Sequence, residues 1–312
     1  MLPCRHLLAC PPRGTHALIQ ERGIPLPPGR VTGGGHVPLE RVEGGDTPVL
    51  TFSSDRGPVR LLLDTGAASA MVTPTLVRRL GLESCPLSSE RFSLAGGGES
   101  CPHVGLAKTR LSALRLGVES NPYLSLRIDG VDGFVLSVVA LPLGIDGVLG
   151  AATLQQLPFG VDPINGRVFF GGPAQRWGPR MPARPELNPL GQIRAVAVSG
   201  SDGTVTLFKA LIDSGAEGLF LTPEAAKLLC PLGAGQPALL VGVCGQQQVW
   251  CQRLMGIGIG PVAPPIQTHE AILTTNPVFD LLGVQAIVGQ EVFRFRRQLW
   301  RLDLDPPRLD LW

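Results

Sequence analysis

Short apolar runs separated by turn residues dominate the chain from Thr47 onward, a pattern typical of an all-β protein. The largely apolar run Val59–Leu63 ends at an aspartate, and so does the run at 210–212. Farther along, Thr73 and Thr222 each precede a proline and a few helix-forming residues. A threonine followed by a proline predicts a helix N-cap with proline at the first helical position. We therefore expect each unit to consist of a strand, an aspartate turn, a second strand and a short helix.

One phrase occurs twice in the chain. Residues 61–67 are Leu-Leu-Leu-Asp-Thr-Gly-Ala, and residues 210–216 are Ala-Leu-Ile-Asp-Ser-Gly-Ala. A Thr-Pro pair follows each aspartate at the same spacing, and each copy later reaches two aliphatic residues and a glycine, at 148–150 and 287–289. A twofold internal repeat accounts for this pattern. We predict an all-β fold of two pseudo-symmetric lobes with few short helices and a cleft between them.

Length and turn composition suggest where the two lobes begin and end. A chain of 312 residues has room for about two domains of ordinary size. Residues 1–45 are rich in Pro and Gly without apolar periodicity, so we expect a tail, leader or pro-segment there. A Pro-rich stretch predicts an inter-lobe linker at 173–190, which leaves 46–172 as the N-terminal lobe and 191–312 as the C-terminal lobe.

Composition narrows the range of functions. A formal net charge of +2 is too small to indicate a nucleic-acid partner, and no apolar stretch is long enough to predict a membrane span. The five histidines are scattered and no Cys-x-x-Cys occurs, so we expect no metal site and no cofactor. The arginine-rich segment 293–301 alternates with apolar residues, which we interpret as a strand with one solvated face rather than as a polyanion site.

The seven cysteines partly follow the repeat. Cys85 and Cys101 follow the first aspartate at spacings close to those of Cys230 and Cys251 after the second. Two equivalent disulfides would suit an oxidising compartment, whereas buried free thiols are the alternative. Localisation is left unknown, and an extracytoplasmic compartment is favoured only if the disulfides form.

Asp64 and Asp213 are the candidates for a paired-carboxylate site. If the two turns meet on the twofold axis, the carboxylates lie side by side and share one proton, because both cannot ionise readily. One then acts as a base on a bound water, and the protonated one polarises a carbonyl. Taken singly, an aspartate two residues before a glycine is an ordinary turn. The matched copies favour the pair.

These motifs resemble those of aspartic peptidases. Asp-Thr-Gly and Asp-Ser-Gly after aliphatic strands, each paired with two hydrophobic residues and a glycine, characterise the pepsin-like and retropepsin-like families. Residues 146–150 resemble the pepsin-like Asp-Gly-Ile-Leu-Gly, and residues 161–170 resemble the strand-turn-strand that follows it. The alanine after each triplet is more similar to retropepsins, in which two identical subunits each supply one aspartate. In outline the resemblance covers residues 46–312.

The resemblance implies a monomeric aspartic-type endopeptidase that hydrolyses an extended peptide or protein substrate without a covalent intermediate. It implies two catalytic residues and four residues of the supporting loops: Asp64 and Asp213, then Thr65, Gly66, Ser214 and Gly215. The glycine-rich loop lies where a substrate-binding flap would be, although a plain hairpin turn fits it equally well: Ala95, Gly96, Gly97 and Gly98.

The chain also departs from the pepsin-like pattern. Its only tyrosine, Tyr123, lies beyond the flap loop, where pepsin-like enzymes usually carry a tyrosine. Gln290 stands where pepsin-like C-terminal lobes commonly have an aspartate, a change that the sequence does not explain. The alternative function is a catalytically inactive, pepsin-fold peptide-binding protein. Loss of either aspartate would have supported that alternative, and both are present.

Overall fold

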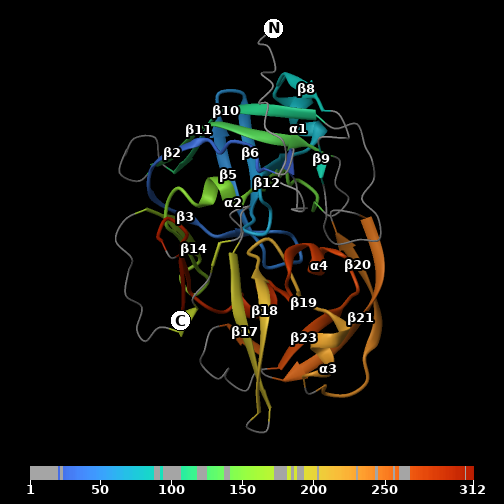
Figure 1. Cartoon of the computed structure of the whole chain (residues 1–312). Coiled ribbons are helices and arrows are strands. Elements are labelled where there is room, and N and C mark those ends of the chain that lie inside the picture. The colour runs from blue at the N-terminus through green and yellow to red at the C-terminus, as the bar shows by residue number, and fades with distance from the viewer. Residues whose placement is uncertain are drawn as a thin grey trace.

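The computed structural model describes residues 20–21, 24–87, 92–93, 107–117, 125–136, 141–171, 181–183, 186–187, 193–201, 204–229, 231–242, 245–255, 257–259, 268–305 and 307–312. These residues form two β lobes, with the N-terminal half above the C-terminal half in Figure 1. None of the described helices is long and apolar enough to cross a membrane.

Each lobe is built on a nine-stranded sheet. The first runs β2-β11-β7-β12-β6-β5-β10-β8 with β4 beside β5, and because β10 also pairs with β11, six of its strands close into a barrel. The second runs β16-β17-β18-β24-β19-β23-β21-β20 with β22 beside β17. The strands of the first sheet are β2 (Arg30–Gly33), β4 (Glu40–Arg41), β5 (Pro48–Ser54), β6 (Gly57–Leu63), β7 (Ala70–Val72), β8 (Ser84–Pro86), β10 (Ala107–Gly117), β11 (Ser125–Val135) and β12 (Gly147–Leu149). Those of the second are β16 (Glu186–Leu187), β17 (Ile193–Ser201), β18 (Thr204–Ile212), β19 (Leu219–Leu221), β20 (Gln236–Gly242), β21 (Gly245–Met255), β22 (Ile257–Ile259), β23 (Thr268–Leu273) and β24 (Ala286–Val288).

A third sheet of six strands joins the two halves (Figure 1). Its order is β15-β26-β25-β13-β14-β3, and the central pair β13–β25 is antiparallel, with Phe159 opposite Trp300. The rings of these two residues stack at 5.7 Å and are fully buried, so the junction shares one apolar core. Its strands are β3 (Gly35–Pro38), β13 (Phe159–Asp162), β14 (Arg167–Phe170), β15 (Met181–Ala183), β25 (Gln298–Arg301) and β26 (Arg308–Leu311). A separate short pair joins β1 (Gln20–Glu21) to β9 (Phe92–Ser93).

The repeat has the same topology in both lobes. Strand β6 lies parallel to β12, which pairs antiparallel with β7, and β18, β24 and β19 form the same arrangement. The last three residues of β6 and of β18, at 61–63 and 210–212, are buried, since both strand ends pack in the interior of their sheets. The repeated aspartates therefore directly follow two equivalent buried strand ends.

The described helices are short, and two of the five, α1 and α3, begin at the expected caps. The side chain of Thr73 accepts a hydrogen bond from the N–H of Leu76 at 3.1 Å, and that of Thr222 accepts one from Ala225 at 3.1 Å. Both caps precede a proline, as predicted. The helices are α1 (Pro74–Arg79), α2 (Ala151–Leu154), α3 (Pro223–Lys227), α4 (Val278–Leu282) and α5 (Gln290–Phe293).

The expected N-terminal tail differs from the structure over its described part. Strand β2 pairs with β11 and β3 pairs with β14, so residues 30–38 belong to two sheets. Leu26 is buried, and its N–H donates to Ser69 Oγ at 2.9 Å. Composition misled here, because these strands are held by backbone pairing with distant strands rather than by a core of their own. The boundaries at 46, 172 and 190 remain predictions.

The arginine-rich segment also differs from the expected strand. Its first residue, Phe293, ends helix α5, and strand β25 begins only at Gln298. Arg294 and Arg297 lie between them and form ion pairs with Asp46 and Asp162 of the N-terminal half, at 3.7 and 3.2 Å. These arginines therefore help to join the halves.

Candidate active site

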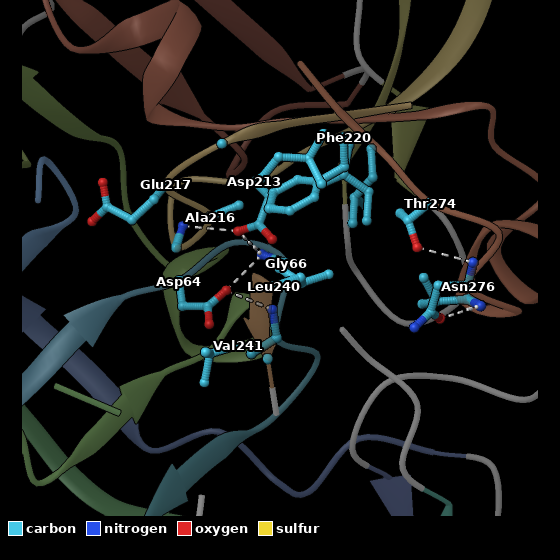
Figure 2. A pocket seen from close by; sticks show the side chains of 18 of the residues that line it. Asp64, Gly66, Asp213, Ala216, Glu217, Phe220, Leu240, Val241, Thr274 and Asn276 are labelled. Carbon is cyan, nitrogen blue, oxygen red and sulfur yellow. Dashed lines mark hydrogen bonds between the residues drawn. The ribbon is translucent and has the colours of Figure 1, made fainter. Parts of the chain in front are cut away.

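The two repeated aspartates lie at one place because their strands end at the same point between the lobes (Figure 2). The N–H of Asp64 donates to the carbonyl of Leu149 at 3.2 Å, and that of Asp213 donates to Val288 at 2.9 Å. In each lobe, the strand that carries the two aliphatic residues before the glycine, β12 or β24, thus holds the start of the aspartate turn. The structure brings together all six residues predicted for the catalytic pair and its supporting loops.

Thr65 and Ser214 lock the two turns together through four buried hydrogen bonds. The Thr65 hydroxyl donates to the carbonyl of Ile212 at 3.1 Å and accepts from the N–H of Ser214 at 2.9 Å. Reciprocally, the Ser214 hydroxyl donates to the carbonyl of Leu63 at 2.6 Å and accepts from the N–H of Thr65 at 3.0 Å. Each hydroxyl therefore crosses to the other lobe, which a sequence alone could not reveal.

Backbone N–H groups surround both carboxylates. Asp64 Oδ1 accepts from Gly66 at 2.9 Å and from Ala67 at 2.8 Å. Asp213 Oδ1 accepts from Gly215 at 2.8 Å and from Gly66 at 3.2 Å, and the N–H of Ala216 also donates to this carboxylate. Figure 2 shows Gly66 between the two side chains. One N–H thus serves both carboxylates.

Glycine is required in each turn by the carboxylate of the other lobe. A Cβ atom on Gly66 would lie under 3.0 Å from the side chain of Asp213, and one on Gly215 would lie under 3.0 Å from that of Asp64. Neither neighbour has room to retreat, because the hydroxyl bonds described above hold both turns. The glycine after each hydroxyl residue therefore makes the close approach of the carboxylates possible.

The environment raises the pKa of both aspartates. Burial raises the pKa of Asp64 well above its ordinary value, and the nearby negative charge of Asp213 raises it further. Burial also raises the pKa of Asp213, although the donated N–H bonds from Gly215, Gly66 and Ala216 oppose the rise. Two neighbouring carboxyl groups with raised pKa can share one proton.

The aspartates lie in the floor of a cavity of about 480 Å3 between the lobes. The cavity wall is mostly apolar: Leu62, Met71 and Val148 come from the N-terminal lobe, and Phe220, Ile272 and Phe279 come from the C-terminal lobe. Three glutamates of the C-terminal lobe, at 217, 270 and 291, also line it. Figure 2 shows Phe220 beside Asp213, with Thr274 and Asn276 farther along the same wall. The cavity therefore combines a mostly apolar wall with carboxylate side chains.

Gln290 is a site residue whose role the sequence did not explain. Its side chain is only 2% exposed, and Nε2 donates to the carbonyl of Ser214 at 2.8 Å. This bond satisfies a backbone oxygen in the middle of the second aspartate turn. Gln290 follows Gly289 at the start of α5, so the repeated glycine motif places it beneath that turn.

Glu217 was not singled out by the sequence either. It follows the second Asp-Ser-Gly-Ala, and its carboxylate accepts from the N–H groups of Asp46 and Thr47, each at 2.8 Å. The hydroxyl of Thr47 also donates to it. A repeated phrase cannot reveal such a contact, because Ala68 occupies the matching place in the first copy.

For the second pair, the structure supports a free thiol over the disulfide alternative. Cys251 is a free thiol that lines the cavity. Burial, together with a hydrogen bond to the Glu270 carboxylate, raises the pKa of this thiol to about 11. Cys85 is disulfide-bonded, but its expected partner Cys101 lies outside the described residues, as do Cys230 and the flap candidate at residues 95–98.

No metal site is formed by the described part of the chain, where no three His, Cys, Asp or Glu side chains gather closely enough to hold an ion.

Known proteins match this chain in part of its sequence and in its fold. The aspartyl protease family matches residues 50–153, which include Asp64 but not Asp213. No curated protein matches. Among solved structures, basic 7S globulin from soybean is 12% identical with a TM-score of 0.49, and covers 89% of this chain and 94% of its own.

A second solved structure has the same extent of similarity. Conglutin gamma, a basic 7S globulin from lupine seeds, is 12% identical with a TM-score of 0.50, again over 89% of this chain and 94% of that one. Such similarity concerns the fold alone. The similarity to conglutin gamma, together with the sheets described above, confirms the predicted all-β fold with two pseudo-symmetric lobes of the aspartic-protease type and few short helices.

Proposed function

We propose that the protein is an aspartic endopeptidase, in which a water molecule activated between Asp64 and Asp213 attacks a peptide carbonyl. The observation that carries the proposal is the N–H of Gly66, which donates to both carboxylates and thereby holds them side by side. A pair held in this way can share one proton. One chain supplies both aspartates, so the proposed enzyme acts as a monomer.

The proposed reaction needs only the two carboxyl groups and water. The ionised aspartate takes a proton from water while the oxygen attacks the carbonyl carbon, and the protonated aspartate gives its proton to the carbonyl oxygen. The product is a tetrahedral diol bound by the pair. Collapse of the diol passes a proton to the amide nitrogen, the C–N bond breaks, and the acid and amine products leave without a covalent enzyme intermediate.

The donor count favours Asp213 as the ionised member before substrate binds. Three backbone N–H groups donate to Asp213 and two donate to Asp64, and a hydrogen bond to the charged form lowers the pKa. In this state Asp64 holds the proton and faces the carbonyl oxygen, and Asp213 is the base. The pair still titrates jointly, so the roles reverse during the cycle.

The cavity supports an extended peptide as the substrate. Its apolar wall offers contact area to side chains, and strand β20 is the last strand of its sheet, with Leu240, Val241 and Gly242 at the cavity. A strand at a sheet edge can pair with the backbone of an extended chain. Peptide binding without hydrolysis remains the alternative function.

Cleavage of an unstructured protein tests the proposal. We expect turnover by the wild type at acidic or neutral pH and its loss in Asp64→Asn and Asp213→Asn. Asp280→Asn, an exposed change on α4, is the matched control and should keep wild-type turnover. Equal turnover in all four proteins would refute the assignment of the dyad.

Binding of a statine-type peptide separates the two functions. The hydroxyl of such a compound takes the place of the attacking water, so it should inhibit the wild type in competition with substrate. Binding of the peptide by a wild type that cleaves nothing over the whole pH range would instead establish the non-catalytic alternative.

A further inference from the structure

Glu217 joins the catalytic turn of the C-terminal lobe to a turn of the N-terminal lobe. Its carboxylate accepts from the backbone N–H groups of Asp46 and Thr47, each at 2.8 Å, and from the Thr47 hydroxyl. The same hydroxyl lies 3.5 Å from the carbonyl of Gly215. A Cβ on Gly45 would clash with the Glu217 carboxylate. The backbone of residues 45–47 therefore lies close against the side chain of Glu217. We call this contact between Glu217 and residues 45–47 the Glu217 tether.

An ion pair between the lobes supports the turn at residues 45–47. Arg294 of the C-terminal lobe lies 3.7 Å from the carboxylate of Asp46, and its other nitrogen lies 3.3 Å from Glu291. Thr47 is 2% exposed, although Glu217 itself is exposed. The tether is therefore anchored on a buried residue of one lobe and braced by a charge pair.

The tether closes a ring through both catalytic aspartates. Thr47 directly precedes β5, β5 pairs with β6 along its length, and β6 leads to Asp64. On the other side, Glu217 is four residues after Asp213 in the same turn. The hydroxyl bonds of Thr65 and Ser214 fix the tips of the two turns, and the six-stranded sheet joins the lobes elsewhere. The tether adds a further contact close to Asp213 and so resists movement of the second aspartate turn against the N-terminal lobe.

We propose that Glu217 is a positioning residue that sets the separation of the Asp64 and Asp213 carboxyl groups through the tether. The inference rests on the proposed function. It predicts a consequence that simple loss of fold stability does not have. If the carboxyl groups move apart, their mutual effect weakens, so the acidic and basic limbs of the pH profile of kcat approach one another. Unfolding of a fraction of the enzyme lowers the rate at every pH without moving the limbs.

The experiment measures kcat against pH for a peptide substrate. Glu217→Ala removes the whole tether, Glu217→Gln keeps one acceptor oxygen, and Thr47→Val removes the hydroxyl while keeping the shape of the side chain. Glu43→Ala is the matched control, because Glu43 is an exposed carboxylate of the same turn and its loss changes the net charge equally. We expect kcat to fall about tenfold in Glu217→Ala, and the acidic and basic limbs of its pH profile to lie closer together. The fall in kcat should be smaller in Glu217→Gln.

A double-mutant cycle completes the test. If the two side chains act through one contact, Glu217→Ala combined with Thr47→Val should lower kcat hardly more than Glu217→Ala alone. Additive losses, or pH limbs in Glu217→Ala that coincide with those of the wild type and of Glu43→Ala, would overturn the positioning role while leaving the peptidase standing. Absence of wild-type turnover would overturn both. If Glu217→Ala does not fold, Glu217→Gln decides by the same criteria.

Discussion

The backbone N–H of Gly66 lies 2.9 Å from Asp64 Oδ1 and 3.2 Å from Asp213 Oδ1, so one donor from the N-terminal lobe bridges the carboxyl groups of both lobes. Two carboxylates around a single donor repel one another when both are charged. The arrangement is therefore stable with one shared proton, which is the state that the proposed hydrolysis uses.

Gly66→Ala is expected to abolish activity. The new Cβ would occupy the place of the Asp213 carboxylate, and the two hydroxyl bonds behind the turn prevent the backbone from moving away. A displacement of about 1 Å in a catalytic group costs about a hundredfold in rate, so kcat/KM should fall by at least that factor. Gly133→Ala is the control, since its Cβ would meet its nearest neighbour at an ordinary 3.6 Å. Full activity in Gly66→Ala would show that the carboxyl groups need not be this close.

Substitutions of Gln290 should destabilise the fold in an order set by hydrogen bonding. Gln290→Leu leaves the carbonyl of Ser214 without its buried donor, which costs about 1–3 kcal/mol. Gln290→Glu should cost more at neutral pH, because a buried carboxylate would face that carbonyl. The new carboxyl should have a raised pKa, so its penalty should shrink as the pH falls and the group gains a proton to donate. Chemical denaturation of both variants at pH 4 and pH 7 measures the difference, and equal penalties at both pH values would contradict it.

Asp64→Asn should stabilise the folded protein at neutral pH while removing activity. The folded state raises the pKa of Asp64, so it binds more protons than the unfolded state between the ordinary value of about 4 and the raised one. Wild-type stability is therefore lost as the pH rises through that window, and asparagine, which does not ionise, avoids the loss. The free energy of unfolding of Asp64→Asn minus that of the wild type should increase from pH 4 to pH 7. A difference that is constant with pH would mean that folding does not raise the pKa of Asp64.

The sequence predicted the parts of the site that lie next to the repeated phrase. Asp64 and Asp213 were identified because two copies of one strand-turn unit lead to equivalent places in a twofold fold. The N-cap threonines Thr73 and Thr222 were predicted for a similar reason, since a cap depends on residues only three positions away. For these residues, short-range sequence patterns that occur once in each half were sufficient for the prediction.

The rest depends on contacts between residues far apart in the chain. Gln290 acts on a carbonyl 76 residues earlier, and Glu217 on N–H groups about 170 residues earlier, and neither contact follows from residue type or local spacing. Strand β2 was missed because it is held by β11, a partner about a hundred residues along the chain, and has little apolar pattern of its own. Spacing after the repeat left a disulfide and a free thiol equally open for Cys251, and only the structure shows that its thiol is free and bonds to Glu270.

Asp162 joins the lobes at a distance from the dyad. It is fully buried in β13 and accepts from the N–H and the side-chain amide of Asn165, at 3.0 and 2.6 Å, and from Arg297 of the other lobe at 3.2 Å. Burial alone would raise the pKa of Asp162, but the bonds from Asn165 and Arg297 outweigh it and lower the pKa below its ordinary value. A carboxylate with a lowered pKa stabilises the fold above the ordinary value, and this contribution is lost as the pH falls through the lowered one.

Asp162→Asn should therefore destabilise the protein at pH 7 by about 2–4 kcal/mol, because an amide N–H would face the guanidinium of Arg297 and one buried acceptor would be lost. The penalty should shrink as the pH is lowered below about 4, where the wild-type carboxylate also begins to lose its charge. Asp55→Asn is the control, since its ion pair with Arg115 is at the surface and its loss should change stability little. Urea denaturation at several pH values provides the measurement. A penalty as small as that of the control would show that this buried ion pair contributes little to holding the lobes together.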